Sequence, residues 1–137
     1  MVKLGSSASS LTCPYKFRNA KFRGTRLIKL GESGKYNKIN INADNEYAFI
    51  FGCANGHMQI AKWLIQLGES EEYNKIYINV YDEQAFRWSC KNGHIKIANW
   101  LIQLGECGGY KKINLHADNE YAFRLSCENG HMQIANW

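Results

Sequence analysis

The sequence predicts an all-α helix-turn-helix solenoid with long loops between its units. One segment occurs three times, as Cys53–Leu64, Cys90–Leu101 and Cys127–Trp137, and its Asn-Gly-His core returns every 37 residues. A fixed period in this range is typical of stacked repeat architectures. Each period holds two apolar segments at helical spacing, and helices of roughly eight to eleven residues are too short to persist alone in water. Stacking on neighbouring units must therefore stabilise them.

Length and composition favour one globular domain inside a cell. The 137 residues have ample aromatic and aliphatic content for a core, and they include one proline. No apolar run reaches the roughly 18 residues of a transmembrane helix, and the first residues lack the apolar stretch of a signal peptide. We therefore expect an intracellular, cytoplasmic protein that does not contact a membrane.

The charge is distributed unevenly along the chain. Residues 1–38 contain nine lysine or arginine residues and one acid, Glu32, and so carry a net charge of +8. Residues 39–137 contain eight basic and eleven acidic residues, a net charge of −3. Because a nucleic-acid platform needs a basic face, the repeat body is not expected to bind nucleic acid.

Residues 1–26 are expected to form a basic leader or a degenerate cap. They are rich in lysine and arginine with aromatic residues between them, and they match the repeat poorly. Similarity to the later units begins only at Leu27, so residues 27–38 form a partial unit. Complete units follow at 39–75 and 76–112, and a truncated unit follows at 113–137. Together these units make up an array over 27–137.

The first complete unit shows where its helices should begin and end. Asp44-Asn45-Glu46 has the residue types of a helix start, a capping side chain followed by an acid. Asn55-Gly56 should end the first helix, since both residues tolerate the left-handed conformation of a C-terminal cap. The second helix should begin at His57 and close at Gly68. In the linker, Ile76, Ile78 and Val80 alternate with polar residues, which predicts a short extended segment.

A cysteine and a histidine four residues apart recur in each unit, at Cys53/His57, Cys90/His94 and Cys127/His131. A structural zinc site needs four such ligands, and stacked units lie too far apart to share one ion easily. A catalytic pair is needed once rather than three times. We therefore expect no metal, no cofactor and no enzyme activity. Instead, the cysteines should be buried and reduced, and the histidines should hydrogen-bond the backbone of the turn.

Tryptophan recurs on the second helix as Trp63, Trp100 and Trp137, which predicts a position in the stacked core. Trp88 differs, because Phe51 and Leu125 hold its position in the other units. Its size is not dictated by the repeat, so we expect it to be partly exposed.

The order helix, Gly-His turn, helix, Gly, loop resembles the ankyrin repeat over about residues 27–137. The matching residues in the first unit are Gly56-His57, Ile60-Ala61, Leu64 and Gly68. The period is 37 residues rather than about 33, and the usual Thr-Pro-Leu-His is replaced, by Tyr47-Ala48-Phe49-Ile50 in the first unit. We expect the helix cap to move upstream, to Asp44, Asp82 and Asp118. This variant resembles the divergent arrays of giant DNA viruses of amoebae, which implies a viral protein in the host cytoplasm.

The resemblance implies a non-catalytic scaffold that binds a protein partner on a concave face of turns and first helices. Tyr81 and Lys91 would lie at its centre, where an aromatic ring beside a long cation is a plausible anchor. The implied contact residues are Ala43, Asp44, Glu46, Ala54, Asn55, Val80, Tyr81, Glu83, Lys91, Asn92, Ala117, Asp118, Glu120, Glu128 and Asn129.

Two other functions stay open at this point. The basic and aromatic segment 15–29 could bind nucleic acid or another acidic surface. Alternatively, the chain is an inactive fragment of a longer array, since it enters the repeat partway through a unit and ends at Trp137. Without a polar capping repeat, we expect fraying after about Gly130 and self-association through that end.

Overall fold

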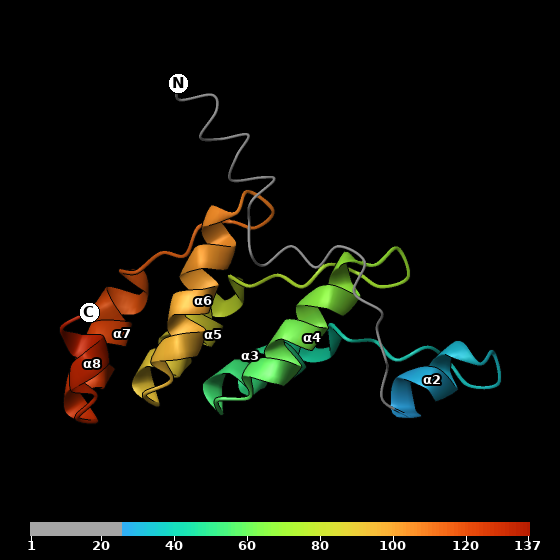
Figure 1. Ribbon diagram of the computed structural model, residues 1–137, viewed down its shortest axis with the longest axis horizontal. Helices are drawn as coiled ribbons and strands as arrows, with labels where there is room; N and C mark the ends of the chain where they lie inside the picture. The colour runs from blue at the N-terminus through green and yellow to red at the C-terminus, as the bar shows by residue number, and fades with distance from the viewer. Residues whose placement is uncertain (1–25) are drawn as a thin grey trace, which may run out of the picture.

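The computed structural model describes residues 26–137, which form seven helices and no strand (Figure 1). The predicted all-α fold is therefore confirmed, whereas all of the predicted leader 1–26 except Arg26 lies outside the described residues. The helices are α2 (Arg26–Glu32), α3 (Ala43–Ala54), α4 (Met58–Glu69), α5 (Val80–Lys91), α6 (Ile95–Glu106), α7 (Ala117–Glu128) and α8 (Met132–Ala135). None of these helices is both long and apolar enough to cross a bilayer.

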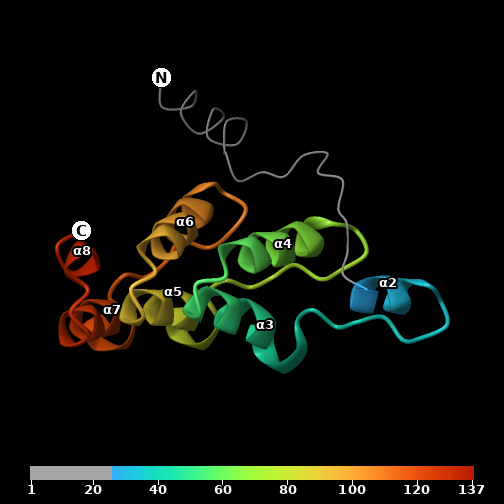
Figure 2. The ribbon, with the colours of Figure 1, turned by 60° about the horizontal axis from the view of Figure 1, so that its bottom comes forward.

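The helices form two layers (Figure 2). The first helix of each unit lies in one layer, α3, α5 and α7, with α5 packed between the other two. The second helices, α4, α6 and α8, lie in the other layer. A continuous core fills the space between the layers, with Phe49, Ile65 and Leu101 almost fully enclosed. Since each unit contributes to this core, the short helices are stabilised by stacking, as expected.

The first helices begin with an unusual left-handed turn. Asp44, Asn45 and Glu46 have φ angles of 54°, 53° and 69°, and the residues one and two periods later have the same conformation. The predicted N-caps are therefore wrong: no side chain caps these helices by a hydrogen bond, and the right-handed helix begins only after the turn. A left-handed residue other than glycine costs roughly 1–2 kcal/mol. Contacts elsewhere must offset that cost.

A buried glutamate supplies such contacts. The carboxylate of Glu83 accepts two hydrogen bonds from Asn79 Nδ2, at 2.9 and 2.8 Å, and one from the backbone N–H of Asn114, at 3.1 Å. Glu46 is held in the same way one period earlier. Because Asn114 belongs to the next unit, each glutamate ties its own turn to the following linker. Glu120, in the last unit, is exposed, and among residues 26–137 its carboxylate hydrogen-bonds only His116.

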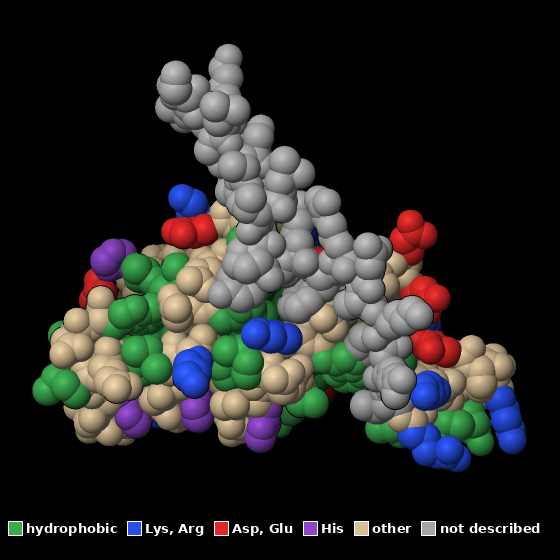
Figure 3. All heavy atoms as spheres, viewed as in Figure 1, with side chains coloured by type: hydrophobic (Ala, Val, Ile, Leu, Met, Phe, Trp, Pro, Cys, Tyr) green, Lys and Arg blue, Asp and Glu red, His purple; other side chains and the backbone are tan. Residues whose placement is uncertain are grey.

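The Gly-His turns stack directly on one another. As predicted, the first helix of the unit ends just before Asn55-Gly56, and Gly56 is left-handed, with φ +80°. The ring of His94 lies against Gly56, where a Cβ atom would come within 2.7 Å of it, and His131 lies against Gly93 in the same way. The histidines form a row along this edge of the stack (Figure 3). The predicted hydrogen bonds from their rings to the turn backbone are not formed among the described residues.

Glycine near the end of the second helix has a different role from the predicted one. The helix α4 continues to Glu69, so Gly68 does not close it. Instead, a Cβ atom at Gly68 would lie 2.8 Å from the backbone nitrogen of Ile76. Gly31 and Gly105 face backbone atoms of their own linkers at similarly short distances. The missing side chain therefore lets the linker fold back onto its helix.

The linker shows the predicted alternation without forming a strand. Ile76 and Ile78 are almost fully buried, whereas Tyr77 between them is exposed. The extended backbone of this segment therefore points its apolar side chains into the core. It has no strand partner among the residues that the structure describes.

The recurrent tryptophans differ in burial. Trp100 is enclosed, and its ring centroid lies 6.4 Å from that of Phe49 in the preceding unit, as expected of a core residue. Trp63 is half-buried and Trp137 is exposed. The same repeat position is therefore a core position mainly in the middle of the stack.

The cysteines also depart in part from the prediction of buried, reduced thiols. Cys53 and Cys90 are free and buried, as expected, but Cys127 is free and exposed. Cys107 is disulfide-bonded, so the prediction is wrong for that residue. Burial raises the pKa of Cys90 to about 12, and it also raises the pKa of Cys53.

We expect iodoacetamide at about pH 8 to modify Cys127 quickly and to leave Cys53 and Cys90 unmodified until the protein unfolds. The reagent attacks the thiolate, which is scarce at a buried thiol with a raised pKa. Peptide mapping by mass spectrometry, with and without denaturant, measures each site separately. Equal labelling of Cys90 and Cys127 in the native protein would contradict the burial described above.

Candidate protein-binding groove

A groove of about 710 Å³ lies along the layer of first helices, spanning α3, α5 and α7. We call it the aromatic groove. Its lining residues are Asp44, Tyr47, Ile50, Phe51, Tyr81, Gln84, Arg87, Trp88 and Tyr121. Three successive units contribute to it, so its shape depends on how the units stack.

Aromatic rings on α3 and α5 pack against one another in the groove. The rings of Tyr47 and Phe51 are stacked, with centroids 4.2 Å apart, and Phe51 meets Trp88 edge to face at 5.3 Å. Such contacts hold large apolar side chains in one orientation. Trp88 is half-buried, in agreement with the prediction that it is partly exposed.

Tyr81, the predicted anchor, lies in the groove and is 55% exposed. Its hydroxyl accepts a hydrogen bond from Asn45 Nδ2 of the preceding unit, at 2.7 Å. The side chain is therefore oriented before any partner arrives. Lys91, the predicted companion of Tyr81, is the last residue of α5 and does not line the groove.

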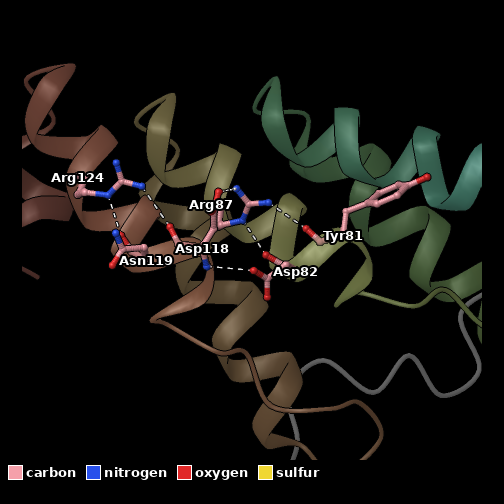
Figure 4. Close-up of polar contacts among 6 residues, drawn as sticks. All are labelled: Tyr81, Asp82, Arg87, Asp118, Asn119 and Arg124. Carbon is pink, nitrogen blue, oxygen red and sulfur yellow. Dashed lines mark hydrogen bonds and ion pairs between the residues drawn. The ribbon is translucent and has the colours of Figure 1, made fainter.

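Arg87 connects the left-handed turn of its own unit to the next unit (Figure 4). Its Nε donates to the carbonyl of Asp82 at 2.7 Å, and its Nη2 donates to the carbonyl of Tyr81 at 2.9 Å. Its Nη1 forms an ion pair with Asp118, at 3.0 Å. Arg124 likewise donates to the turn carbonyls of its own unit, those of Asn119 and Asp118. These arginines help to offset the cost of the left-handed conformation.

The groove has one charged side chain without a partner in the described residues, and its charge is negative. The guanidinium of Arg87 is neutralised by Asp118 and lies 4.7 Å from the ring centre of Tyr121. Asp44 is exposed, and it has no hydrogen-bond or ion-pair partner among residues 26–137. An incoming ligand would therefore meet aromatic rings and an unpaired carboxylate.

A comparison with protein-family models shows which family the chain belongs to. The family model for ankyrin repeats, in three copies, matches residues 20–112, which is more than half of the chain. The chain is an ankyrin-repeat protein. Ankyrin repeats generally mediate protein–protein interactions, and the family is generally non-enzymatic. Comparison with the curated proteins found no matching relative, and comparison with the solved structures found no matching chain.

The structure corrects the ankyrin-based contact list at Glu46, Glu83, Ala54 and Ala117, which are buried. The two glutamates face the next unit rather than a partner, because their carboxylates accept its backbone hydrogen bonds. The other predicted residues are exposed or half-buried: Ala43, Asp44, Asn55, Val80, Tyr81, Lys91, Asn92, Asp118, Glu120, Glu128 and Asn129.

Of these predicted residues, only Asp44 and Tyr81 line the aromatic groove. Asn92 and Asn129 instead donate side-chain hydrogen bonds to backbone carbonyls of the preceding ankyrin unit. They therefore hold the units together at the far end of the first helices.

The prediction missed the groove residues Tyr47, Ile50, Phe51, Gln84, Arg87, Trp88 and Tyr121. Two signals in the sequence could have found them. Gln84 and Trp88 are spaced four residues apart, which places them on one face of a helix. Their positions also vary in residue type between the three ankyrin units, as expected where a surface rather than a core is formed.

Two other candidate sites receive no support from the geometry. The basic segment 15–29 lies mostly outside the described residues, and only Arg26–Lys29 of it is seen, in α2. Within residues 26–137, no three histidine, cysteine or acidic side chains lie together as ligands for a metal ion.

Proposed function

We propose that this ankyrin-repeat chain is a non-catalytic scaffold that binds a protein partner in the aromatic groove. The observation that carries the proposal is the cluster of partly exposed aromatic side chains, Tyr47, Tyr81 and Trp88, around one hollow. Tyrosine and tryptophan are enriched among the residues that dominate the energy of protein interfaces. Interaction with proteins is also the general role of the family.

The groove is well suited to binding because its side chains are already oriented. Asn45 holds the hydroxyl of Tyr81, and Phe51 packs against the ring of Trp88. Less conformational entropy is lost on binding when the contact residues are fixed beforehand. The stack of units therefore acts as a rigid support for the groove.

Replacing Trp88 by alanine is expected to weaken binding at least about tenfold, because it removes the largest aromatic surface in the groove. The ligands would be peptides of about 12 residues, selected by phage display against the intact chain and then measured by fluorescence anisotropy. The matched control is Lys96→Ala on α6, an exposed residue of the other layer. Equal affinities of the two variants, both shown to be folded by circular dichroism, would refute binding in the groove.

We also infer that the chain is a viral protein that acts in the cytoplasm of a host cell. The support is the resemblance of its 37-residue units to the divergent ankyrin arrays of giant DNA viruses of amoebae. Detection by antibody in the cytosolic fraction of infected amoebae would agree with this inference. Its absence from all infected-cell fractions would contradict it.

A second proposal concerns copies of this chain, which we infer associate through the last unit. An apolar hollow of about 410 Å³ lies there, lined by Phe86, Leu115, Phe123, Ile134 and Trp137 among others. Phe123 is 56% exposed, and Leu115 and Trp137 are also exposed. Apolar patches of this kind favour association.

Replacing Phe123 by lysine is expected to weaken this self-association at least about tenfold, since it places a charge in the apolar contact. Sedimentation equilibrium over a range of concentrations measures the effect. Leu27→Lys, at the opposite end of the stack, is the control, because Leu27 is similarly exposed at 67%. A purely monomeric chain, or equal effects of both variants, would refute the proposal.

A further inference from the structure

One aspartate–tyrosine pair in the stack already binds a guanidinium group. Asp118 and Tyr121, from the third unit, hold Arg87 of the unit before it. The ion pair is 3.0 Å long, and the guanidinium carbon lies 4.7 Å from the ring centre. Arg87 and Asp118 are seen side by side in Figure 4. The site therefore consists of a carboxylate from the left-handed turn and an aromatic ring three residues later.

The same pair occurs once more, two periods earlier, as Asp44 and Tyr47. Asp44 has the left-handed conformation of Asp118, so the two pairs occupy equivalent places in their units. The middle unit has Tyr81 and Gln84 there, and the residue facing it from the preceding unit is Ile50 rather than an arginine. The middle unit therefore lacks the acidic and aromatic pair, and the unit before it lacks the arginine.

Among residues 26–137, no arginine is paired with Asp44 or lies over the ring of Tyr47. The residue one period before Ile50 is Cys13, which has no guanidinium group. Asp44 is exposed and unpaired within the described residues, and Tyr47 is 55% exposed. Within the part of the chain that the structure describes, only Phe51 is stacked on the ring of Tyr47. The pair therefore has the groups of the arginine site and lacks the arginine.

We propose that Asp44 and Tyr47 form a binding site for an arginine side chain of the partner protein. The inference rests on the proposed function, namely that this face of the stack binds a protein. An arginine fits best, because its planar guanidinium can hydrogen-bond a carboxylate and stack on an aromatic ring at once. It would supply a positive partner for the carboxylate of Asp44. The partner therefore carries an exposed arginine next to the apolar residues that enter the aromatic groove.

The Asp44–Tyr47 pair also borders a second hollow, of about 410 Å³, which is lined mostly by apolar side chains. Its other lining residues include Leu27, Ile39 and Trp63. A segment that places its arginine on the pair can therefore extend in two directions, along the aromatic groove or into this hollow.

The test is a titration of the intact ¹⁵N-labelled chain with N-acetyl-L-arginine amide, followed by NMR. We expect saturable shifts at the amides of Asp44 and Tyr47 and their neighbours. The citrulline analogue has nearly the same shape without the charge, and it should produce no such shifts. Asp44→Asn should weaken arginine binding at least about fivefold, because it removes the charge that the guanidinium pairs with. Asparagine tolerates the left-handed conformation, so the fold should be kept.

The control variant is Glu128→Gln, which removes an exposed acid on α7 away from the pair. Equal shifts with arginine and citrulline amides, shifts centred elsewhere, or no saturation would overturn the proposal. The proposal would also be overturned if N-acetyl-L-arginine amide bound only to the Arg18→Gln or Arg23→Gln variant. In that case an arginine of this chain would occupy the site in the unaltered protein.

The selected peptides separate this proposal from the proposed function. One outcome is that the affinity falls with Trp88→Ala but is unchanged by Asp44→Asn and by replacing each peptide arginine with citrulline. This outcome would overturn the proposed arginine site, while the proposal that peptides bind in the aromatic groove would stand. Affinity that responds to neither Trp88→Ala nor Asp44→Asn would overturn both.

Discussion

Replacing Glu83 by alanine is expected to lower the free energy of unfolding by about 3 kcal/mol. The side chain is only 4% exposed, and its carboxylate accepts hydrogen bonds from the Asn79 side chain and from the backbone of Asn114. Alanine would remove the acceptor of the Asn114 backbone N–H and would leave Asn79 Nδ2 with only the carbonyl of Lys112, at 3.3 Å, as a partner in the described residues. It would also uncouple the left-handed turn from the following linker. Urea unfolding followed by circular dichroism measures the change.

The chain provides its own control for this prediction. Glu120 holds the same position in the last unit, but it is exposed, and its carboxylate hydrogen-bonds only His116 in the described part of the chain. Glu120→Ala should therefore change stability by less than about 0.5 kcal/mol. Equal losses for Glu83→Ala and Glu120→Ala would contradict a role for the glutamate in coupling units. Glu83→Gln should also be destabilising, since its amide NH₂ would face the donor group of Asn79.

Replacing Gly68 by alanine is expected to lower the free energy of unfolding by about 2–3 kcal/mol. The substitution improves helix propensity by about 1 kcal/mol, and by that measure alone it should stabilise α4. The new Cβ, however, would lie 2.8 Å from the backbone nitrogen of Ile76 and 3.0 Å from the carbonyl oxygen of Asn74. These backbone atoms belong to the linker that is folded onto the helix, so relieving the clash requires the linker to move.

Gly52→Ala is the matched control, because Gly52 is also buried in a helix of the stack. Its new Cβ would meet only a methyl group of Ile60, at an ordinary 3.6 Å. Helix propensity should then prevail, and Gly52→Ala should stabilise the protein by about 0.5–1 kcal/mol. Thermal and urea unfolding of the two variants would test the contrast. A stabilising Gly68→Ala would show that the linker does not pack closely on α4.

Periodicity made much of this fold predictable. The repeated Asn-Gly-His segment indicated two helices per unit, and the position of Gly56 correctly predicted the end of the first helix. These features depend on local chemistry, chiefly the freedom of glycine to adopt positive φ. Burial of Trp100 and of Cys90 followed from their places on the inner helix faces.

The left-handed turn could not be predicted in the same way. Asp44, Asn45 and Glu46 have the residue types of a helix N-terminus, and aspartate and asparagine also tolerate the left-handed conformation. The choice between the two depends on contacts far along the chain. Glu46 reaches the backbone of Tyr77, and in the next unit Arg87 binds the turn carbonyls. A local sequence pattern does not predict contacts with residues that are far away in the chain.

The candidate site was harder to predict for a related reason. Tyr81 and Asp44 were expected at the surface and do line the groove, whereas Glu83 was expected there and is buried. Glu83 belongs to the left-handed turn, and its carboxylate faces the next unit, which the residue types of the turn do not indicate. Tyr47 and Trp88 line the groove instead.

Photo-cross-linking to a selected peptide tests the central claim most directly. A benzoylphenylalanine would be placed at Gln84, in the middle of the aromatic groove, and in a second variant at Lys96, on α6. We predict a cross-link from position 84 that excess unlabelled peptide abolishes, and none from position 96. A cross-link from position 96 without one from position 84 would show that the partner binds the layer of second helices, and would contradict the account.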